Sequence, residues 1–178
     1  MNILVSGGSK NGKSLYAQKA AREMSEQLDV PLYYIATMIP RDGEDEARIK
    51  RHIEERRGWG FTTLEQGTEI TGLLHRDDVE KSGVFLLDSV TALLSNEMFR
   101  EDGSVDEEAG ARVVSDLEEF AAKTGNTVFV SDYIYGDAED YDELTEHYRR
   151  SLAGADRALA ACCDTVMEIS FGTEERWK

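Results

Sequence analysis

The chain has 178 residues, which is long enough for one domain with a substantial core and short for two. Hydrophobic residues make up 40% of it, which excludes a disordered protein, and the formal net charge of −16 disfavours binding to nucleic acid or anionic lipid. No apolar run approaches the ~20 residues of a membrane span. The two cysteines, Cys162 and Cys163, are adjacent, which excludes a disulfide framework and fits a cytoplasmic protein.

The first predicted elements are a strand, a glycine-rich loop and a helix. Residues 3–6 are a short, largely apolar run that leads directly into a G-x-x-x-x-G-K-S pattern. This pattern is the phosphate-binding P-loop, in which backbone N–H groups and a lysine surround the phosphates of a nucleotide. It consists of Gly7, Gly8, Ser9, Lys10, Asn11, Gly12, Lys13 and Ser14.

Each part of this loop has an expected role. We expect Gly7 and Gly12 to supply turns with positive φ, which let successive N–H groups point at one phosphate. Lys13 is expected to reach the β- and γ-phosphates, and the Ser14 hydroxyl to bind Mg²⁺. The alternative is a glycine-rich turn that matches by accident. The preceding strand and the apolar residues at helical spacing in residues 15–28 favour nucleotide binding.

A strand at residues 31–37 and a basic helix at residues 44–57 are predicted next. Asp42 is placed to cap the N-terminus of that helix. The helix carries the basic cluster of an otherwise acidic chain: Arg48, Lys50, Arg51, His52, Arg56 and Arg57. We expect a short strand at residues 61–65 and a short helix at residues 68–75 to follow.

A buried strand at residues 83–88 ends in a carboxylate, Asp88, as a Walker B motif does. Such an aspartate orients Mg²⁺ beside the P-loop serine. The alternative is an ordinary cap for the helix that follows. The P-loop upstream favours the metal role for Asp88.

The rest of the chain continues to alternate between helices and strands. Helices are predicted at residues 90–99, 107–124 and 143–162, strands at residues 127–131 and 165–169, and an acidic loop at residues 132–142. Alternating apolar strands and helices predict one α/β domain over residues 1–178. Its mostly parallel sheet would carry helices on both faces, as in P-loop NTPases of the RecA-like type. Right-handed crossovers would bring the P-loop, Thr37, Asp88 and the Asp132 loop to one edge.

Several stretches match one known family in the same order along the chain. They are residues 3–14, Tyr34-Ile35-Ala36-Thr37, Ala47-Arg48-Ile49 with His52 and Arg56, Thr63-Leu64-Glu65, and residues 86–91 running on to Ser95-Asn96, with a weaker match at Tyr148-Arg149, Gly154 and Ala160. On these residues the sequence resembles the adenosylcobinamide kinase/adenosylcobinamide-phosphate guanylyltransferase family of cobalamin biosynthesis. Many families share the P-loop, whereas the A-R-I-x-x-x-H helix after an I-A-T strand is much more specific.

The resemblance implies a bifunctional enzyme. It would phosphorylate the aminopropanol hydroxyl of adenosylcobinamide with ATP or GTP, and then transfer GMP from GTP to that phosphate through a guanylylated histidine. Some members carry two adjacent histidines, of which the earlier is the nucleophile. That earlier position is Arg51 here, so His52 inherits the role. The family precedent for assembly is a homo-oligomer, a trimer.

The resemblance also implies further nucleotide contacts. The residues carried over are Ala36, Thr37, Arg48, Arg56 and Glu65, in addition to the P-loop and Asp88. The chemistry of the helix supports His52 independently, because neighbouring cations disfavour a charged imidazole and a neutral one attacks phosphorus. His75 and His147 have no such neighbours in the sequence, so we expect them to be surface residues.

Two other functions stay open at this point. A kinase that has lost guanylyl transfer is one, since Arg51 replaces a histidine and Asp132-Tyr133-Ile134-Tyr135 replaces the usual Asn-Glu-Val-Gly. The family's usual Asn-Gln pair in the last helix is likewise Asp156-Arg157 here. A non-catalytic nucleotide switch is the other, although the chain lacks an N-K-x-D guanine-reading motif.

Overall fold

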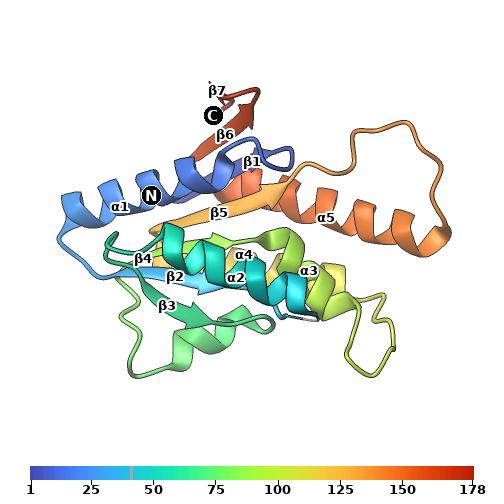
Figure 1. Ribbon diagram of the computed structural model, residues 1–178, viewed down its shortest axis with the longest axis horizontal. Helices are drawn as coiled ribbons and strands as arrows, with labels where there is room; N and C mark the ends of the chain where they lie inside the picture. Colours follow the sequence, from blue (N-terminus) through green and yellow to red (C-terminus); the bar gives the residue numbers. More distant parts are fainter. Residues whose placement is uncertain (41) are drawn as a thin grey trace.

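A single sheet forms the centre of the molecule (Figure 1). The computed structural model describes residues 1–40 and 42–178, with the backbone alone at residues 48 and 55. The strands are β1 (Ile3–Gly7), β2 (Leu32–Ala36), β3 (Thr62–Glu65), β4 (Val84–Asp88), β5 (Thr127–Asp132), β6 (Thr165–Ser170) and β7 (Thr173–Arg176). Their order across the sheet is β3-β2-β4-β5-β1-β6-β7, and the pairs are parallel except β6 with β7.

Helices cover both faces of the sheet (Figure 1). They are α1 (Lys13–Leu28), α2 (Gly43–Glu55), the 3-10 helix η1 (Ile70–His75), α3 (Val90–Met98), α4 (Ala109–Thr124) and α5 (Glu143–Cys162). The α1 helix packs on one face of the sheet, and η1, α3, α4 and α5 pack on the other. The predicted α/β fold with a mostly parallel sheet is therefore confirmed.

Each central strand contributes to a core on both faces because successive side chains of a strand point to opposite sides. Leu4 of β1 packs toward α3, α4 and α5, whereas its neighbours Ile3 and Val5 pack toward α1. In β4, Phe85 stacks on Tyr33 and meets Phe120 of α4 edge-on. This two-sided burial explains why the strands read as continuous apolar runs.

The carboxyl ends of five strands meet at one edge of the sheet. Ala36 at the end of β2 pairs in register with Asp88 at the end of β4, and with Glu65 of β3. Gly7 at the end of β1 pairs with Asp132 at the end of β5. The expectation that the P-loop, Asp88 and Asp132 share an edge is therefore confirmed.

The C-terminal hairpin differs from the prediction, which ended with the strand at residues 165–169. A seventh strand, β7, runs antiparallel to β6 after a turn in which Phe171 and Gly172 have φ of 51° and 76°. All four residues of β7 are exposed and most are charged, so the strand shows no apolar alternation. Two helices also differ from the prediction. The helix predicted at residues 107–124 begins at Ala109, and the short helix predicted at residues 68–75 is the 3-10 helix at Ile70–His75.

Among the described residues, none of the helices combines the length and the apolar character that crossing a bilayer requires.

Candidate active site

The glycine-rich loop joins β1 to α1 and opens toward the carboxyl edge of the sheet. Gly12 has φ of 90°, as expected, and serves as the N-cap residue of α1. No described side chain caps this end of α1, so its first N–H groups are left without a capping acceptor, as an anion site at a helix N-terminus requires.

The expectation that Gly7 adopts a positive φ is wrong, although glycine is still required at this position. Gly7 does not have a positive φ; the second residue of the loop that does is Lys10, at 59°. Instead, a Cβ on Gly7 would lie 2.4 Å from the carbonyl oxygen of Ile169 on β6. Glycine is required there because the neighbouring strand approaches closely, a constraint that the loop pattern does not contain.

Lys13 lies at the bottom of the site and is held by two oxygen atoms. The residue is only 7% exposed, and Nζ donates to the Gly8 carbonyl oxygen at 3.1 Å. Nζ also forms an ion pair with Asp132 Oδ1 at 2.6 Å. The buried ammonium is thus fixed at the edge of the sheet where a phosphate would be bound.

Asp88 and Ser89 are adjacent at the end of β4, but only Ser89 caps the helix that follows. The hydroxyl of Ser89 accepts a hydrogen bond from Ala92 N at 3.2 Å, which makes Ser89 the N-cap of α3. Asp88 does not cap that helix; its Oδ2 accepts a hydrogen bond from the Tyr34 hydroxyl at 3.1 Å. The capping alternative for Asp88 is therefore wrong, and Asp88 lines the same cavity as Ser14.

Thr37 joins β2 to the start of α3. It is fully buried, and its Oγ1 accepts from Ser89 N at 2.7 Å and donates to Ser89 O at 2.9 Å. Asn96 of α3 donates to the carbonyl oxygens of Thr37 and Gly67, at 2.7 and 2.9 Å. The hydroxyl of Thr37 therefore positions Ser89 and the end of β4.

Helix α2 carries His52 beside the P-loop. Asp42 caps it as predicted, accepting from Glu44 N and Asp45 N at 2.9 Å each. His52 is half-buried and lines the same cavity as Lys13, whereas Arg51 is exposed. The side chain of Arg48 lies outside the described part of the chain.

Arg56, directly after α2, is a buried cation. The residue is 7% exposed, and its guanidinium carbon lies 3.4 Å from the centre of the Tyr34 ring. Nη1 is buried and has no hydrogen-bond partner among the described residues. Tyr34 thus lies between two polar groups, with Arg56 on its face and Asp88 at its hydroxyl.

These groups surround one cavity of about 550 Å³. Seven of the predicted site residues line it: Lys13, Ser14, Ala36, His52, Arg56, Glu65 and Asp88. Lys50 adds a further cation, and Glu46 and Asp132 add carboxylates. Of the predicted P-loop, only Lys13 and Ser14 are among the residues described as lining the cavity, and residues 7–12 precede them in the chain. The other two histidines of the chain do not line this cavity. His75 is exposed on η1, and His147 Nε2 contacts Glu107 O at 2.9 Å.

Part of the cavity wall was missed by the sequence analysis. Apolar side chains form it, namely Met38, Ile39, Pro40, Ile49 and Ile53, together with Tyr34, Gln66 and Gly67. The two isoleucines four residues apart on α2 are the signal that was available, since this spacing places them on one face of a helix. These residues give the cavity an apolar part in addition to its charged groups.

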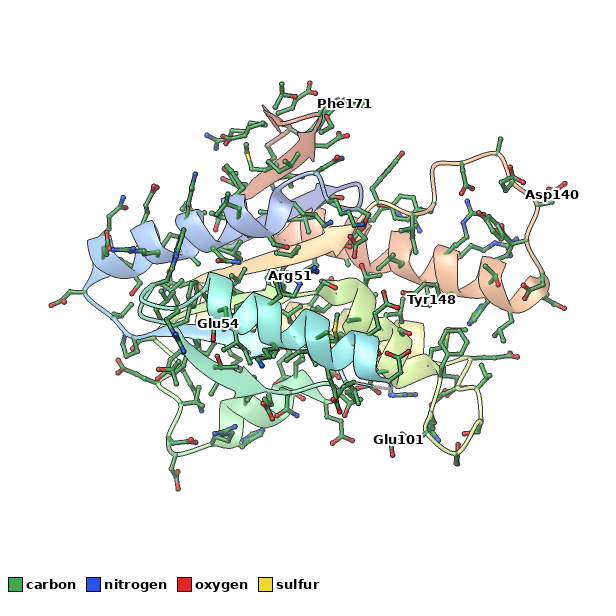
Figure 2. All side chains as sticks on the ribbon, viewed as in Figure 1. Arg51, Glu54, Glu101, Asp140, Tyr148 and Phe171 are labelled. Atoms are coloured by element: carbon green, nitrogen blue, oxygen red, sulfur yellow. The ribbon has the colours of Figure 1, made fainter. Side chains whose placement is uncertain are left out.

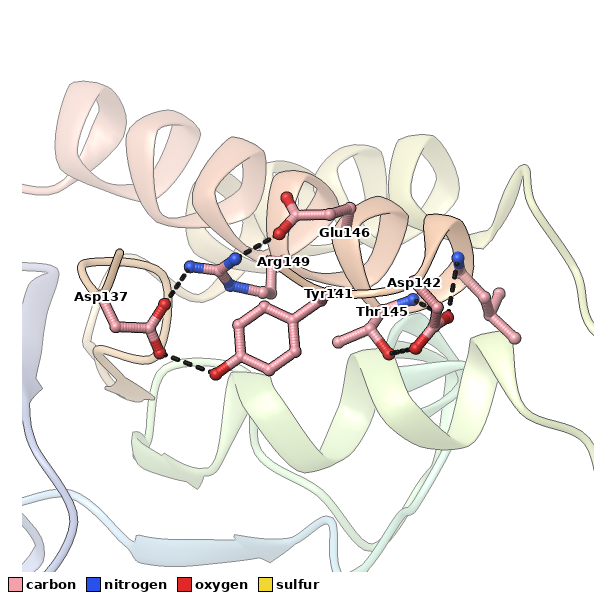
Figure 3. A network of polar contacts seen from close by, with 7 residues as sticks. Asp137, Tyr141, Asp142, Thr145, Glu146 and Arg149 are labelled. Atoms are coloured by element: carbon pink, nitrogen blue, oxygen red, sulfur yellow. Dashed lines mark hydrogen bonds and ion pairs between the residues drawn. The ribbon is translucent and has the colours of Figure 1, made fainter. Parts of the chain in front are cut away.

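The loop after Asp132 is fixed to α5. Arg149, which is 9% exposed, pairs through Nη2 with Asp137 Oδ1 at 2.7 Å and through Nη1 with Glu146 (Figure 3). The Tyr141 hydroxyl donates to Asp137 Oδ2 at 2.9 Å, and the guanidinium lies 4.6 Å from the Tyr141 ring centre. Asp142 then caps α5 by accepting from Leu144 N and Thr145 N. The loop therefore leaves β5 on a defined path.

Sequence comparison finds relatives along nearly the whole chain. The model of the family described as "Cobinamide kinase / cobinamide phosphate guanyltransferase" matches residues 3–176. The bifunctional adenosylcobalamin biosynthesis protein CobU of Escherichia coli (strain K12) is 28% identical over 182 residues, covering 97% of each chain. The corresponding protein CobP of Pseudomonas aeruginosa is 29% identical, covering 93% of this chain and 91% of its own.

Structural comparison finds the same fold in more distant proteins. A KaiC-like protein from Pyrococcus horikoshii OT3 matches with a TM-score of 0.54 and 14% identity, covering 94% of this chain and 69% of its own. The flagellar accessory protein FlaH from Methanocaldococcus jannaschii matches with a TM-score of 0.53 and 11% identity, covering 99% and 77%. With the family match over residues 3–176, the chain belongs to the cobinamide kinase / cobinamide phosphate guanyltransferase family of P-loop enzymes.

Proposed function

We propose that the enzyme phosphorylates the hydroxyl of an adenosylcobinamide-type corrinoid with a nucleoside triphosphate, and then transfers GMP from GTP to that phosphate through His52. The family membership supports the two reactions. The observation that carries the histidine step is the shared cavity, because His52 of α2 lines the same space of about 550 Å³ as Lys13 and Asp88. This volume lies in the range of small-molecule sites.

In the kinase step, the P-loop holds the triphosphate. The N–H groups at the start of α1 and the Lys13 ammonium bind the phosphates. Ala36 and Glu65 end the neighbouring strands and line the cavity, and Thr37 follows Ala36. Ser14 and Asp88 fit Mg²⁺, because a hydroxyl and a carboxylate are the oxygen ligands that it prefers and both line the cavity. When bound, Mg²⁺ neutralises charge on the phosphates. Tyr34 orients Asp88 for this contact.

In the guanylyl transfer step, the imidazole of His52 attacks the α-phosphorus of GTP. An N–P bond forms, the bond from phosphorus to the β-phosphate oxygen breaks, and pyrophosphate leaves with the electron pair. The phosphate on the corrinoid then displaces His52 and takes the GMP group. Arg56 is suited to bind phosphate oxygens in this step, because its buried Nη1 has no partner among the described residues. Arg48 is a further candidate from the resemblance alone.

The test is incubation with α-labelled GTP and Mg²⁺. We expect a label on the protein that is lost in acid and kept in base, as a P–N bond is. His52→Ala should lose this label and the GDP-linked product, yet still phosphorylate the corrinoid, because that step needs Lys13, Mg²⁺ and positioning. His75→Ala is the matched control, because His75 is exposed on η1 and should keep the label.

Two outcomes would contradict the histidine step. A label retained on His52→Ala would assign the nucleophile to another residue. A wild-type protein that phosphorylates the corrinoid without taking up the label would favour a kinase that has lost guanylyl transfer, with Arg51 in place of the missing histidine.

We also propose that the enzyme works in the cytoplasm, where nucleoside triphosphates are available, and that it forms a homo-oligomer, for which the family resemblance suggests a trimer.

A further inference from the structure

Tyr34 of β2 contacts two different groups of the candidate active site, one with its hydroxyl and one with its ring. The residue is buried and lines the cavity that also contains Lys13 and His52. The ring of Phe61 meets the Tyr34 ring edge-on, with 6.0 Å between the two centroids. A ring packed in this way has little freedom to turn, so it can hold the groups that touch it in place.

The hydroxyl of Tyr34 reaches the carboxylate at the end of the neighbouring strand. Leu86 is the register partner of Tyr34. Asp88 lies two residues further along β4, on the same face of the sheet, because alternate residues of a strand share a face. The hydroxyl donates to Asp88 Oδ2 at 3.1 Å. A carboxylate has about four acceptor positions, so this bond orients Asp88 and leaves other positions for a metal ion.

The ring of Tyr34 supports a cation from a different element. The guanidinium carbon of Arg56, which follows α2, lies 3.4 Å from the centre of the ring. Arg56 is buried, so solvent screens the attraction between the cation and the electron-rich ring face only weakly. The ring therefore fixes the position of a guanidinium that is proposed to bind phosphate in guanylyl transfer.

We propose that Tyr34 is a positioning residue that serves the two reactions through two separate contacts, an inference that rests on the proposed function. Its hydroxyl positions Asp88 and so sets the affinity of the site for the metal ion that accompanies the nucleotide in both reactions. Its ring positions Arg56 and so sets the rate of guanylyl transfer alone. Groups that orient a metal ligand typically change metal affinity or activity by about 10–100-fold when they are substituted.

The role of the hydroxyl is tested with Tyr34→Phe, which keeps the ring and removes only the oxygen atom. Mn²⁺ is the probe for the metal site, because electron paramagnetic resonance measures its binding to the complex of protein and GDP without any turnover. We expect the Kd of Mn²⁺ to rise by about tenfold or more. The Kd of GDP without metal should stay the same, because the P-loop is unchanged.

Tyr33→Phe is the matched control for the hydroxyl. Tyr33 precedes Tyr34 on β2 and is also buried, but its side chain packs on the opposite face of the sheet and does not line the cavity. Its hydroxyl accepts from Glu80 N at 3.1 Å, so this variant also loses one hydrogen bond. Mn²⁺ binding should nevertheless be unchanged. In an Asp88→Asn background, Tyr34→Phe should have little further effect on Mn²⁺ binding, because the hydroxyl acts through that carboxylate.

The role of the ring is tested by replacing Tyr34 with pentafluorophenylalanine and comparing this variant with Tyr34→Phe. The two side chains have nearly the same shape and both lack the hydroxyl, but fluorine withdraws electron density from the ring face and removes its attraction for a cation. At saturating Mg²⁺, guanylyl labelling should be slower in the fluorinated variant by about fivefold or more, as expected for a buried contact between a cation and a ring. The rate of corrinoid phosphorylation should be equal in the two variants.

The same comparison in two arginine backgrounds identifies the cation. In Arg56→Met, the two ring variants should label at the same rate, since no guanidinium remains on the ring. In Arg51→Met they should still differ, because Arg51 is exposed on α2 and is not among the residues that line the cavity (Figure 2).

Three results would overturn the assignment. If Tyr34→Phe binds Mn²⁺ as tightly as the wild type, the hydroxyl does not position Asp88. If Tyr33→Phe weakens Mn²⁺ binding as much as Tyr34→Phe does, the effect comes from the stability of β2. If the two ring variants label equally fast, or differ as much in corrinoid phosphorylation as in labelling, the ring does not act through Arg56.

Failure of the proposed function gives a different result. A wild-type protein that phosphorylates no corrinoid and takes up no guanylyl label overturns the proposed function, and with it the role of the ring. The Mn²⁺ titration needs no reaction, so it still decides whether the Tyr34 hydroxyl positions Asp88.

Discussion

At the scale of single residues, the contacts of Asp88 and Ser89 assign them different roles. Asp88 and Ser89 are adjacent polar residues at a strand-to-helix junction, and either could cap α3 by residue type. The hydroxyl of Ser89 takes that role, and Tyr34 holds Asp88 toward the cavity. Helix capping and the proposed metal contact therefore fall to two adjacent side chains, whose effects substitution can separate.

We predict that Asp88→Asn cuts phosphoryl transfer by about 100-fold or more, because a bound metal ion contributes several kcal/mol to stabilising the charge of the transition state. Nucleotide binding without metal should change by less than about threefold. Ser89→Ala should instead lower the free energy of unfolding by about 1 kcal/mol, the usual cost of losing an N-cap. Urea unfolding and steady-state kinetics on the same preparations separate the two effects. Activity of Asp88→Asn that recovers on cooling would show that the substitution acts through stability and would contradict the metal role.

Among the elements, the segment at residues 133–142, between β5 and α5, extends well beyond the end of the sheet (Figure 1). It holds its shape through Arg149, which contacts Asp137, Glu146 and the ring of Tyr141 (Figure 3). The segment begins at Asp132, so its anchoring also influences how the end of β5 is presented to Lys13.

We predict that Arg149→Met loosens residues 133–142 and lowers the free energy of unfolding by about 1.5–3 kcal/mol, the range for hydrogen bonds to charged groups. Methionine keeps the apolar stem of the side chain and removes the guanidinium, and with it both ion pairs. Hydrogen exchange of the loop amides should accelerate, while the amides of α1 and α4 keep their protection. Arg150→Met is the matched control, since Arg150 is exposed on the same helix. Equal exchange in both variants would show that Arg149 does not anchor the loop.

For the whole molecule, a buried acid links stability to pH. Asp156 of α5 is 5% exposed, and its Oδ2 accepts from the Tyr135 hydroxyl at 2.8 Å. Burial raises the pKa of Asp156, against the opposing effect of that hydrogen bond. Between the ordinary aspartate pKa and the raised one, Asp156 therefore keeps its proton in the folded state, whereas the unfolded chain has released it. Stability from this group falls as pH rises from the ordinary aspartate pKa to the raised one.

We predict that Asp156→Asn removes this loss, because an amide does not ionise. The free energy of unfolding of the variant minus that of the wild type should grow as pH rises through the window above the ordinary aspartate pKa, and then level off. Urea titrations of both proteins between pH 4 and pH 8 measure this difference, and the titrations of other groups cancel between them. A difference that does not vary with pH would mean that Asp156 is ionised in the folded state.

The sequence by itself determined the features that depend on contiguous residues. The P-loop pattern, the strand that ends at Asp88, and the cap at Asp42 each follow from the conformational and hydrogen-bonding preferences of a few neighbours. Strands with apolar residues at every position indicated a sheet covered on both faces, and the helix at residues 143–162 was predicted with its observed limits.

The tertiary structure alone decided which distant residues meet. The order of the strands places β5 beside β1, and so brings Asp132 to Lys13 across more than a hundred residues of chain. The stacking of Arg56 on Tyr34 and the need for glycine at position 7 likewise depend on neighbours from other elements. The strand β7 forms only because the exposed edge of β6 accepts it. Such contacts result from packing the whole chain at once, and no local pattern of residue types contains them.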